Sequence, residues 1–223
     1  MTKRRIHKLR VSLVLLVLAG TIAAVGFFLW GCHGMEEGER WGGGSDVVRT
    51  PVTDQPVVNQ GIPLFLQSDS RWGNQIYGDD RMEITGCGPT CLAMVRCGLG
   101  HDTTWTPDQV AEVAERDGYY AKGKGSVWAL MSEGAGKFGL TADHVVFDKT
   151  HILQTLRNGK PIICAMGPGD FTTEGHFIVL AGVDEASGEI LVNDPNSREN
   201  SIRTWDVERI MAQTKNLWSF SLI

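Results

Sequence analysis

The sequence contains few cysteines, and their spacing does not fit the sites that cysteines usually build. There are five of them in 223 residues. No two form a CxxC pair, and none combines with histidine in the spacing typical of structural zinc sites. We therefore expect no metal and no cofactor, and the small number also argues against a disulfide-dense miniprotein. The five are Cys32, Cys87, Cys91, Cys97 and Cys164.

The sequence also lacks an excess of positive charge. It has 21 Lys and Arg residues against 26 Asp and Glu residues. Five of the basic residues lie in the first ten positions, which leaves 16 against 26, a net charge of −10, in the rest of the chain. A nucleic-acid partner is therefore not expected, because phosphate binding needs a basic surface. The hydrophobic content of 42% instead indicates a globular protein, and the length allows one ordinary domain with accessory sequence.

One stretch lacks charge altogether. Residues 11–30 contain no charged side chain, and the ten residues before them carry five basic and no acidic ones. A helix of this length spans about 30 Å, whereas the apolar region of a cleavable signal has only ~7–15 residues. We predict a cytoplasmic basic segment at residues 1–10, a single transmembrane anchor at residues 11–30 and an extracytoplasmic position for the rest of the chain. The pair Gly31-Cys32 leaves cleavage and lipidation open as an alternative.

The remaining sequence divides into a linker and one domain. Residues 31–60 include the run Gly42-Gly43-Gly44-Ser45 and show no sustained apolar period, so we predict a flexible linker. Residues 61–223 are predicted to form one α+β domain, with helices first and strands afterwards. Helices are expected at residues 90–97, 106–118, 126–137 and 151–158. Strands are expected at residues 62–66, 161–166, 176–183, 189–193 and 218–222.

Cys87 is the first candidate for chemistry. It lies between Gly86 and Gly88, directly before a predicted helix. Free N–H groups and the positive end of the helix dipole favour a thiolate there, and glycine lets a substrate backbone come close. The alternative is a buried cysteine in a tight turn. The choice between the two depends on whether Cys87 has a basic partner.

His176 is the candidate partner. It begins a predicted strand, and the next strand leads directly to Asp194 and Asn196. If Val183 pairs with Glu189, His176 faces Asn196, and Asp194 is a diagonal neighbour on the same face of the sheet. Either side chain could hold the imidazole in the required tautomer. We choose Asp194, because a carboxylate also stabilises the imidazolium that accompanies a thiolate, although an aspartate here could simply form a turn.

Five motifs follow one another along the predicted domain. They are Gln67-Ser-Asp-Ser-Arg-Trp72, Gly86-Cys-Gly-Pro-Thr90, Asn158-Gly-Lys-Pro161, Gly175-His-Phe-Ile-Val-Leu180 and Val192-Asn-Asp-Pro-Asn196. Together they resemble the C39-like family of papain-fold cysteine peptidases, over residues 62–223. The resemblance implies a papain-like fold, in which N-terminal helices pack on an antiparallel sheet. It also implies that Cys87 is the nucleophile and His176 the general base. Asp194 would orient His176, and Gln67 would donate a hydrogen bond to the oxyanion.

The position of the glutamine leaves an alternative open. Gln67 lies twenty residues before Cys87, further than in the bacteriocin-leader peptidases of this clan, so Gln75 is a rival for the oxyanion role. Those leader peptidases work on the cytoplasmic side of ATP-driven exporters. This sequence combines one predicted anchor with an external domain and has no P-loop, so cleavage of double-glycine leaders is not expected.

The expected activity is hydrolysis of amide bonds through an acyl-enzyme. An anchor of bacterial type suggests a peptide, a surface protein or a cell-wall peptide as substrate. Two alternatives remain. A catalytically silent pseudo-peptidase would bind peptides without cleaving them, although such a protein has no need for the set of Cys, His, Asp and Gln. An acyltransferase would use the same acyl-enzyme with an amine in place of water, and the sequence does not distinguish it from a hydrolase.

Overall fold

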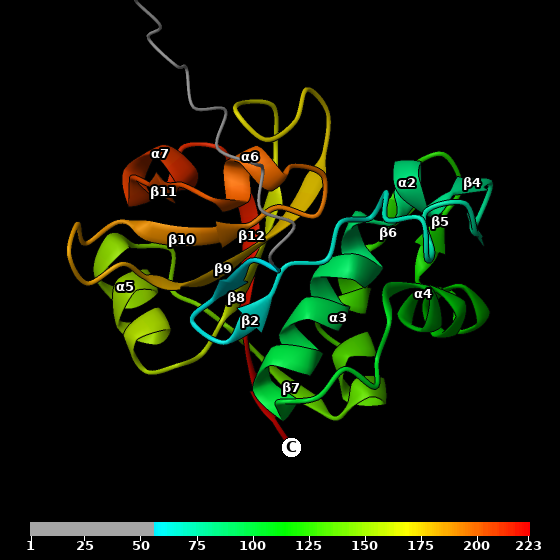
Figure 1. The fold of residues 1–223 in the computed structure, drawn as a ribbon, viewed down its shortest axis with the longest axis horizontal. Coiled ribbons are helices and arrows are strands. Elements are labelled where there is room, and N and C mark those ends of the chain that lie inside the picture. The colour runs from blue at the N-terminus through cyan, green and yellow to red at the C-terminus, as the bar shows by residue number, and fades with distance from the viewer. Residues whose placement is uncertain (1–55) are drawn as a thin grey trace, which may run out of the picture. The chain divides into compact units, whose positions relative to one another are not determined.

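The computed structural model describes residues 56–223 (Figure 1). The predicted cytoplasmic segment, the predicted anchor and residues 31–55 of the predicted linker lie outside this range. Among the described residues, no helix is both long and apolar enough to cross a membrane.

The described chain begins with a small hairpin, in which β1 (Val58–Asn59) pairs with β2 (Ile62–Pro63). The hairpin is fastened to the second half of the domain by the Asn59 side chain, whose Nδ2 group donates hydrogen bonds to three acceptors. Regular structure therefore begins before residue 61, within the predicted linker. The acceptors are the carbonyl oxygens of Val192 and Ser201, each at 3.1 Å, and Oδ1 of Asn193 at 2.7 Å.

The centre of the domain is a six-stranded sheet in which every neighbouring pair is antiparallel. Four predicted strands are confirmed in it, as β8, β9, β10 and β12. Two further strands, β7 and β11, were not predicted. In spatial order the strands are β11 (Thr204–Trp205), β10 (Ile190–Asn193), β9 (His176–Val183), β8 (Ile162–Met166), β12 (Thr214–Leu222) and β7 (Leu140–His144).

The sheet has a hydrophobic core on each face, which explains why β9 is buried along its whole length. Phe177 and Val179 belong to the core under the helices of the first half, whereas Ile178 and Leu180 belong to the core on the opposite face. This alternation follows from the two-residue period of a strand. Each such side chain contributes about 1.5–3 kcal/mol on full burial. The middle of the sheet is therefore a firm support for the residues at its edges.

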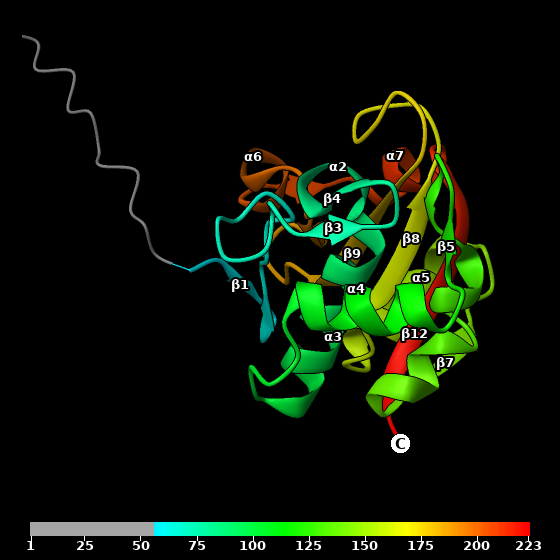
Figure 2. The same cartoon turned by 90° about the vertical axis from the view of Figure 1, so that its right-hand side faces the viewer.

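Helices cover both faces, as Figures 1 and 2 show. The central helix α3 packs against β9 on one face, and α5 lies on the other. Predicted helices are confirmed as α3, α4 and α5. The longer helices are α3 (Cys87–Gly100), α4 (Pro107–Arg116) and α5 (Lys149–Arg157). The short ones are α2 (Met82–Thr85), α6 (Arg198–Ser201) and α7 (Val207–Met211).

Two predicted elements are corrected by the structure. The expected helix at residues 126–137 is instead strand β6 (Gly125–Ser126) followed by two 3₁₀ turns, η1 (Trp128–Leu130) and η2 (Gly134–Phe138). Glycines at 134 and 136 weaken an α-helix there, because glycine costs about 1 kcal/mol in a helix interior. The expected strand at residues 62–66 ends at Pro63.

Two further hairpins flank the helices. The first is formed by β3 (Ile76–Tyr77) and β4 (Asp80–Arg81), and the second by β5 (Tyr120–Ala121) and β6. Neither belongs to the large sheet. Their pairing is only two residues long, so their position depends on side-chain contacts with the rest of the domain.

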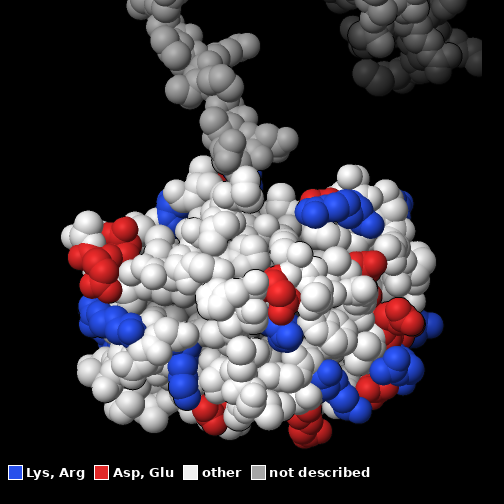
Figure 3. All heavy atoms as spheres, turned by 60° about the horizontal axis from the view of Figure 1, so that its bottom comes forward, with Lys and Arg blue, Asp and Glu red and all other residues white. Residues whose placement is uncertain are grey.

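Charged residues are distributed over the surface with both signs mixed. On the face drawn in Figure 3, basic and acidic side chains alternate over short distances, and no continuous basic area is visible there. The absence of a nucleic-acid partner stays a prediction.

Candidate active site

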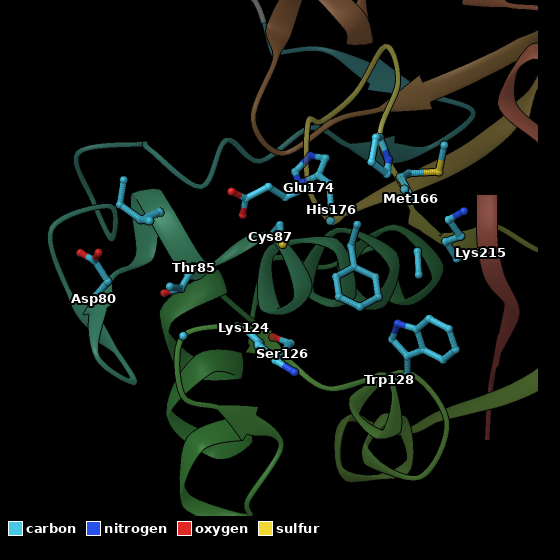
Figure 4. Close-up of a pocket in the computed structure, with 18 of the residues that line it drawn as sticks. Asp80, Thr85, Cys87, Lys124, Ser126, Trp128, Met166, Glu174, His176 and Lys215 are labelled. Carbon is cyan, nitrogen blue, oxygen red and sulfur yellow. The ribbon is translucent and has the colours of Figure 1, made fainter. Parts of the chain in front are cut away.

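Cys87 is the first residue of α3 and lies on an open cleft of about 640 Å³ (Figure 4). Its side chain is half-buried, unlike those of the other described cysteines, which are buried. Two sets of residues face one another across the cleft. We call the first the hairpin wall; it includes Asp79, Asp80, Ile84, Thr85, residues 123–126 and Trp128. We call the second the sheet wall; it includes residues 165–168, residues 174–177 and Lys215.

His176 begins β9 and connects Cys87 to Asp194. Its Nε2 atom lies 2.8 Å from Asp194 Oδ1, and the two side chains are 7% and 1% exposed. The imidazole also lies close enough to the Cys87 thiol for each side chain to shift the pKa of the other. Since Nε2 is engaged by the carboxylate, Nδ1 is the ring nitrogen left for the thiol. Asp194 thereby fixes the tautomer and the orientation of the imidazole.

The electrostatics of Cys87, His176 and Asp194 favour a thiolate–imidazolium pair. Burial lowers the pKa of His176, but hydrogen bonds and charge from Asp194 and Cys87 outweigh it and raise the pKa to about 10. Burial raises the pKa of Cys87, but the hydrogen bond and charge of His176, with backbone N–H groups of Phe177 and Gly88, leave it lowered. Cys87 is thus the described cysteine best prepared to act as a nucleophile.

The other cysteines have the opposite character. Burial raises the pKa of Cys91 well above its usual value, and that of Cys164 to about 12. Burial also raises the pKa of Cys97. Cys91 donates through its sulfur to the Phe177 carbonyl at 3.3 Å, one helical turn after Cys87. All four described cysteines are free thiols. Cys87 and Cys91 lie on the same helix, yet the pKa of Cys87 is lowered and that of Cys91 is raised.

Asp194 is held by a dense set of hydrogen bonds. Its Oδ1 atom accepts from His176 and from the Asn196 backbone N–H at 2.9 Å, while Oδ2 accepts from Asn200 Nδ2 at 2.8 Å. Its own N–H donates to Ser201 Oγ at 2.9 Å. Asn200 and Ser201 were not singled out in the sequence. The run Asp-Pro-Asn-Ser before them, with Ser197 as the N-cap of α6, is the signal that predicts this short helix.

The structure places Asp194, and not Asn196, against His176. The predicted starting pair is wrong, because Val183 pairs with Ile190 and not with Glu189. A bulge between Leu191 and Val192 then brings Val192 opposite Leu180 and Asn193 opposite Val179, as predicted, but the β9–β10 ladder ends at Asn193. The Asn196 side chain is exposed in the turn that follows, and only its backbone contacts Asp194. The direct pairing of Asn196 with His176 is therefore wrong.

The two candidate glutamines lie in different surroundings. Gln67 is buried, its backbone N–H donates to the Pro195 carbonyl at 2.8 Å, and its Nε2 group donates to the Glu83 carbonyl at 2.8 Å. It therefore bridges the chain beside Asp194 and the chain four residues before Cys87. No described hydrogen bond joins it to Cys87. Gln75 is exposed, bonds to Asp108 and lines a different hollow.

Two tryptophans near the site lie in different surroundings. Trp72 is buried and donates through Nε1 to the Leu66 carbonyl. Trp128 is 50% exposed and forms part of the hairpin wall, with its ring 6.0 Å from that of Trp218. Within residues 56–223, no cluster of His, Cys, Asp and Glu is arranged to hold a metal ion.

The architecture is mixed α/β, with helices on both faces of an antiparallel sheet. The family model described as Peptidase_C39 like family matches residues 59–220. Because this match covers most of the chain, the protein belongs to that family, which confirms the resemblance found in the sequence.

Comparison with solved structures and curated proteins adds two findings. A crystal structure of a Bacillus anthracis protein, provisionally assigned as a C39-like peptidase, is 16% identical in sequence, with a TM-score of 0.47. The similarity covers 76% of this chain and 99% of the Bacillus chain. No curated protein matches the sequence.

Proposed function

We propose that the domain is a cysteine peptidase that hydrolyses amide bonds through an acyl-enzyme. In this proposal Cys87 is the nucleophile, His176 the general base and acid, and Asp194 the residue that orients His176. The observation that carries it is the placement of the half-buried thiol beside a buried imidazole that lowers its pKa, with the buried carboxylate of Asp194 2.8 Å from that imidazole. A raised pKa of His176 beside a lowered pKa of Cys87 is what a preformed ion pair requires.

The proposed reaction follows from this arrangement. The Cys87 thiolate attacks the carbonyl carbon, and the imidazolium of His176 gives its Nδ1 proton to the leaving amine. A water molecule then attacks the thioester and passes a proton to Nδ1, which releases the acid and restores the ion pair. Asp194 stays ionised and stabilises the imidazolium at both stages.

Gln67 is proposed to stabilise the oxyanion. Its Nε2 group carries two hydrogens, and the bond to the Glu83 carbonyl uses one of them. A Gln67→Ala variant is therefore expected to lose about 10²–10³-fold in kcat, as for other oxyanion donors. Gln75→Ala is the matched control and is expected to retain activity, because Gln75 is exposed, bonds to Asp108 and lines a different hollow, whereas Gln67 bonds to the chain on either side of the site.

We propose further that the enzyme is membrane-anchored, with residues 1–10 in the cytoplasm, residues 11–30 across the membrane and the catalytic domain outside. The support is the length and charge pattern of that segment. Protease added to intact cells should remove the domain. Recovery of the domain in the medium, starting shortly after residue 30, would contradict the anchor.

The decisive experiment uses the full chain in detergent with iodoacetamide and fluorescent casein. Mass spectrometry should find Cys87 alkylated much faster than the other cysteines of the domain, and casein cleavage should disappear in Cys87→Ala. Fast labelling without cleavage of casein or other peptides would favour a pseudo-peptidase. Transfer of the acyl group to an added amine in preference to water would favour an acyltransferase. Equal labelling of all the cysteines would overturn the nucleophile assignment.

A further inference from the structure

Two hydroxyl groups from separate hairpins meet beside the nucleophile. Tyr77 comes from β3 and Ser126 from β6, and their hydroxyl oxygens lie 2.8 Å apart although the residues are 49 positions apart in sequence. Ser126 belongs to the hairpin wall of the Cys87 cleft, where Figure 4 shows it near the start of α3. Neither residue was singled out in the sequence, and the proposed reaction uses neither.

Ser126 lies directly against the turn that carries the thiol. A Cβ atom on Gly88 would come within 2.5 Å of Ser126 Oγ and 2.6 Å of its Cβ. Gly88 is the residue after Cys87, and its backbone N–H is one of the groups that lower the pKa of the Cys87 thiol. On the other side of the thiol, the Thr85 hydroxyl donates to the Tyr77 carbonyl at 3.0 Å. The Tyr77–Ser126 pair therefore adjoins both ends of the segment that contains Cys87.

The burial of Tyr77 determines which hydroxyl donates. Its side chain is fully buried, and among the described residues Ser126 is the only hydrogen-bond partner of its hydroxyl. Burial also raises the pKa of Tyr77, so the phenol keeps its proton. If Ser126 donated, that phenolic proton would be buried without an acceptor, which is the costly case. Tyr77 therefore donates to Ser126, and the Ser126 proton is left without a described acceptor.

The surroundings of Ser126 suit a peptide backbone. Ser126 is only 8% exposed, but it lines the cleft next to Gly125, which has a positive φ of 74° and no side chain to block close approach. A peptide in the cleft presents a carbonyl oxygen at every residue, whatever its side chains. A fixed O–H donor at this place can thus contribute to the binding of many sequences.

We propose that the Ser126 hydroxyl donates a hydrogen bond to a backbone carbonyl oxygen of the peptide bound at Cys87, and that Tyr77 is the positioning residue that directs it. This inference rests on the proposed function. Ser126 acts in substrate binding, so its loss weakens affinity while the Cys87–His176 pair keeps its reactivity.

The test compares two alkylating probes on the full chain in detergent. Iodoacetamide reports the reactivity of the Cys87 thiol, whereas benzyloxycarbonyl-Phe-Ala fluoromethyl ketone must also occupy the cleft as a peptide does. In Ser126→Ala we expect KI for the ketone to rise by about three- to tenfold, the effect of one neutral hydrogen bond. The maximal inactivation rate and the rate of alkylation by iodoacetamide should stay within about twofold of wild type. The substitution removes one hydrogen bond to the bound peptide and leaves the Cys87 and His176 side chains in place.

A double variant separates binding from folding. Ser126→Ala leaves the Tyr77 phenol unpaired, whereas Tyr77→Phe with Ser126→Ala removes both hydroxyls, so its melting temperature should recover toward wild type. KI should remain high in the double variant, because the donor is still missing. Recovery of KI together with stability, or an unchanged KI in Ser126→Ala, would overturn the inference while leaving Cys87 reactive. If wild-type Cys87 reacts with neither probe, the proposed function fails and the inference fails with it.

Discussion

The sheet wall and the hairpin wall of the Cys87 cleft are held in different ways. On the sheet wall, His176 stands on a strand buried along its whole length, and Asp194 behind it is fixed by a set of short hydrogen bonds. The hairpin wall comes from two small hairpins outside the main sheet, from the short helix α2 and from η1, and a few side-chain contacts such as Tyr77 with Ser126 join the hairpins. The comparison suggests that the proton-transfer apparatus is rigid, whereas the surface that meets the substrate rests on small, separable parts.

The thiol between the two walls gives the largest expected effect. Cys87→Ala should lower kcat/KM for casein by at least about 10³-fold, because it removes the nucleophile. Its melting temperature should stay near wild type, because the side chain is only half-buried. Cys91→Ala is the matched control one helical turn away. It should keep its activity and lose about 1 kcal/mol of stability through the buried cavity. Similar activity losses in both variants would mean that Cys87 has only a packing role.

On the sheet wall, Asp194→Ala should be damaging in two ways. We expect about a 10²-fold loss of kcat, because the imidazole loses its orienting carboxylate. We also expect a loss of about 3 kcal/mol in the free energy of unfolding, because His176, Asn200 and the Asn196 backbone N–H lose their buried carboxylate partner. Asn196→Ala should be nearly neutral, since its exposed side chain makes no described contact with His176 and its backbone N–H remains. Steady-state kinetics and urea unfolding of the two variants test this expectation. A larger loss of kcat in Asn196→Ala than in Asp194→Ala would assign the orienting role to Asn196.

The proposed ion pair of Cys87 and His176 predicts that the stability of the domain depends on pH. The folded pKa of His176, at about 10, lies above its unfolded value of about 6.5. Its contribution to stability is therefore complete below pH ~6.5 and is lost as the pH rises through about 10. Urea midpoints of wild type and His176→Ala should converge over that interval. Iodoacetamide should also label wild-type Cys87 at a pH where the His176→Ala thiol is protonated and slow. Parallel stability curves would show that the imidazole is not charged in the native state.

The smallest effect is expected on the hairpin wall, away from the thiol. The Tyr120 hydroxyl bonds to Asp79 and receives a hydrogen bond from the Asp79 N–H, which links the two hairpins at an exposed position. Tyr120→Phe should cost less than about 1 kcal/mol, because the bond is open to solvent. Hydrogen exchange should nevertheless quicken at Gly123, whose N–H also points at Asp79. A cooperative loss of stability in this variant would mean that the hairpin wall is as firmly built as the sheet wall.

The sequence was most informative where local pattern and chemistry coincide. Hydrophobic runs bounded by Gly, Pro and Asn predicted β8, β9 and β10, and the helix predicted at residues 90–97 lies within α3, which begins at Cys87. The pair of His176 and Asp194 was reached because both stand at the ends of adjacent strands. The bulge beyond Leu191 was not foreseeable, since no residue there has an unusual backbone requirement.

The hairpin wall was largely beyond prediction, for a physical reason. Its strands are too short to show a hydrophobic period, and the contacts that hold them join distant residues, as between Tyr77 and Ser126. The segment at 126–137 contains enough apolar residues for a helix, so the pattern favoured one. Because of tertiary contacts and two glycines, the segment forms two 3₁₀ turns instead of an α-helix, and Trp128 lies on the surface of the cleft.

The attachment of Asn59 has a mechanical consequence. Its amide is bonded to Val192, Asn193 and Ser201, so a pull on the chain before residue 58 enters the domain at the two segments that enclose Asp194. The three hydrogen bonds of the Asn59 side chain would share the load of such a pull. Tension on the N-terminal side would therefore be carried to the turn that holds Asp194 through the Asn59 side chain, as well as into the β1–β2 pairing.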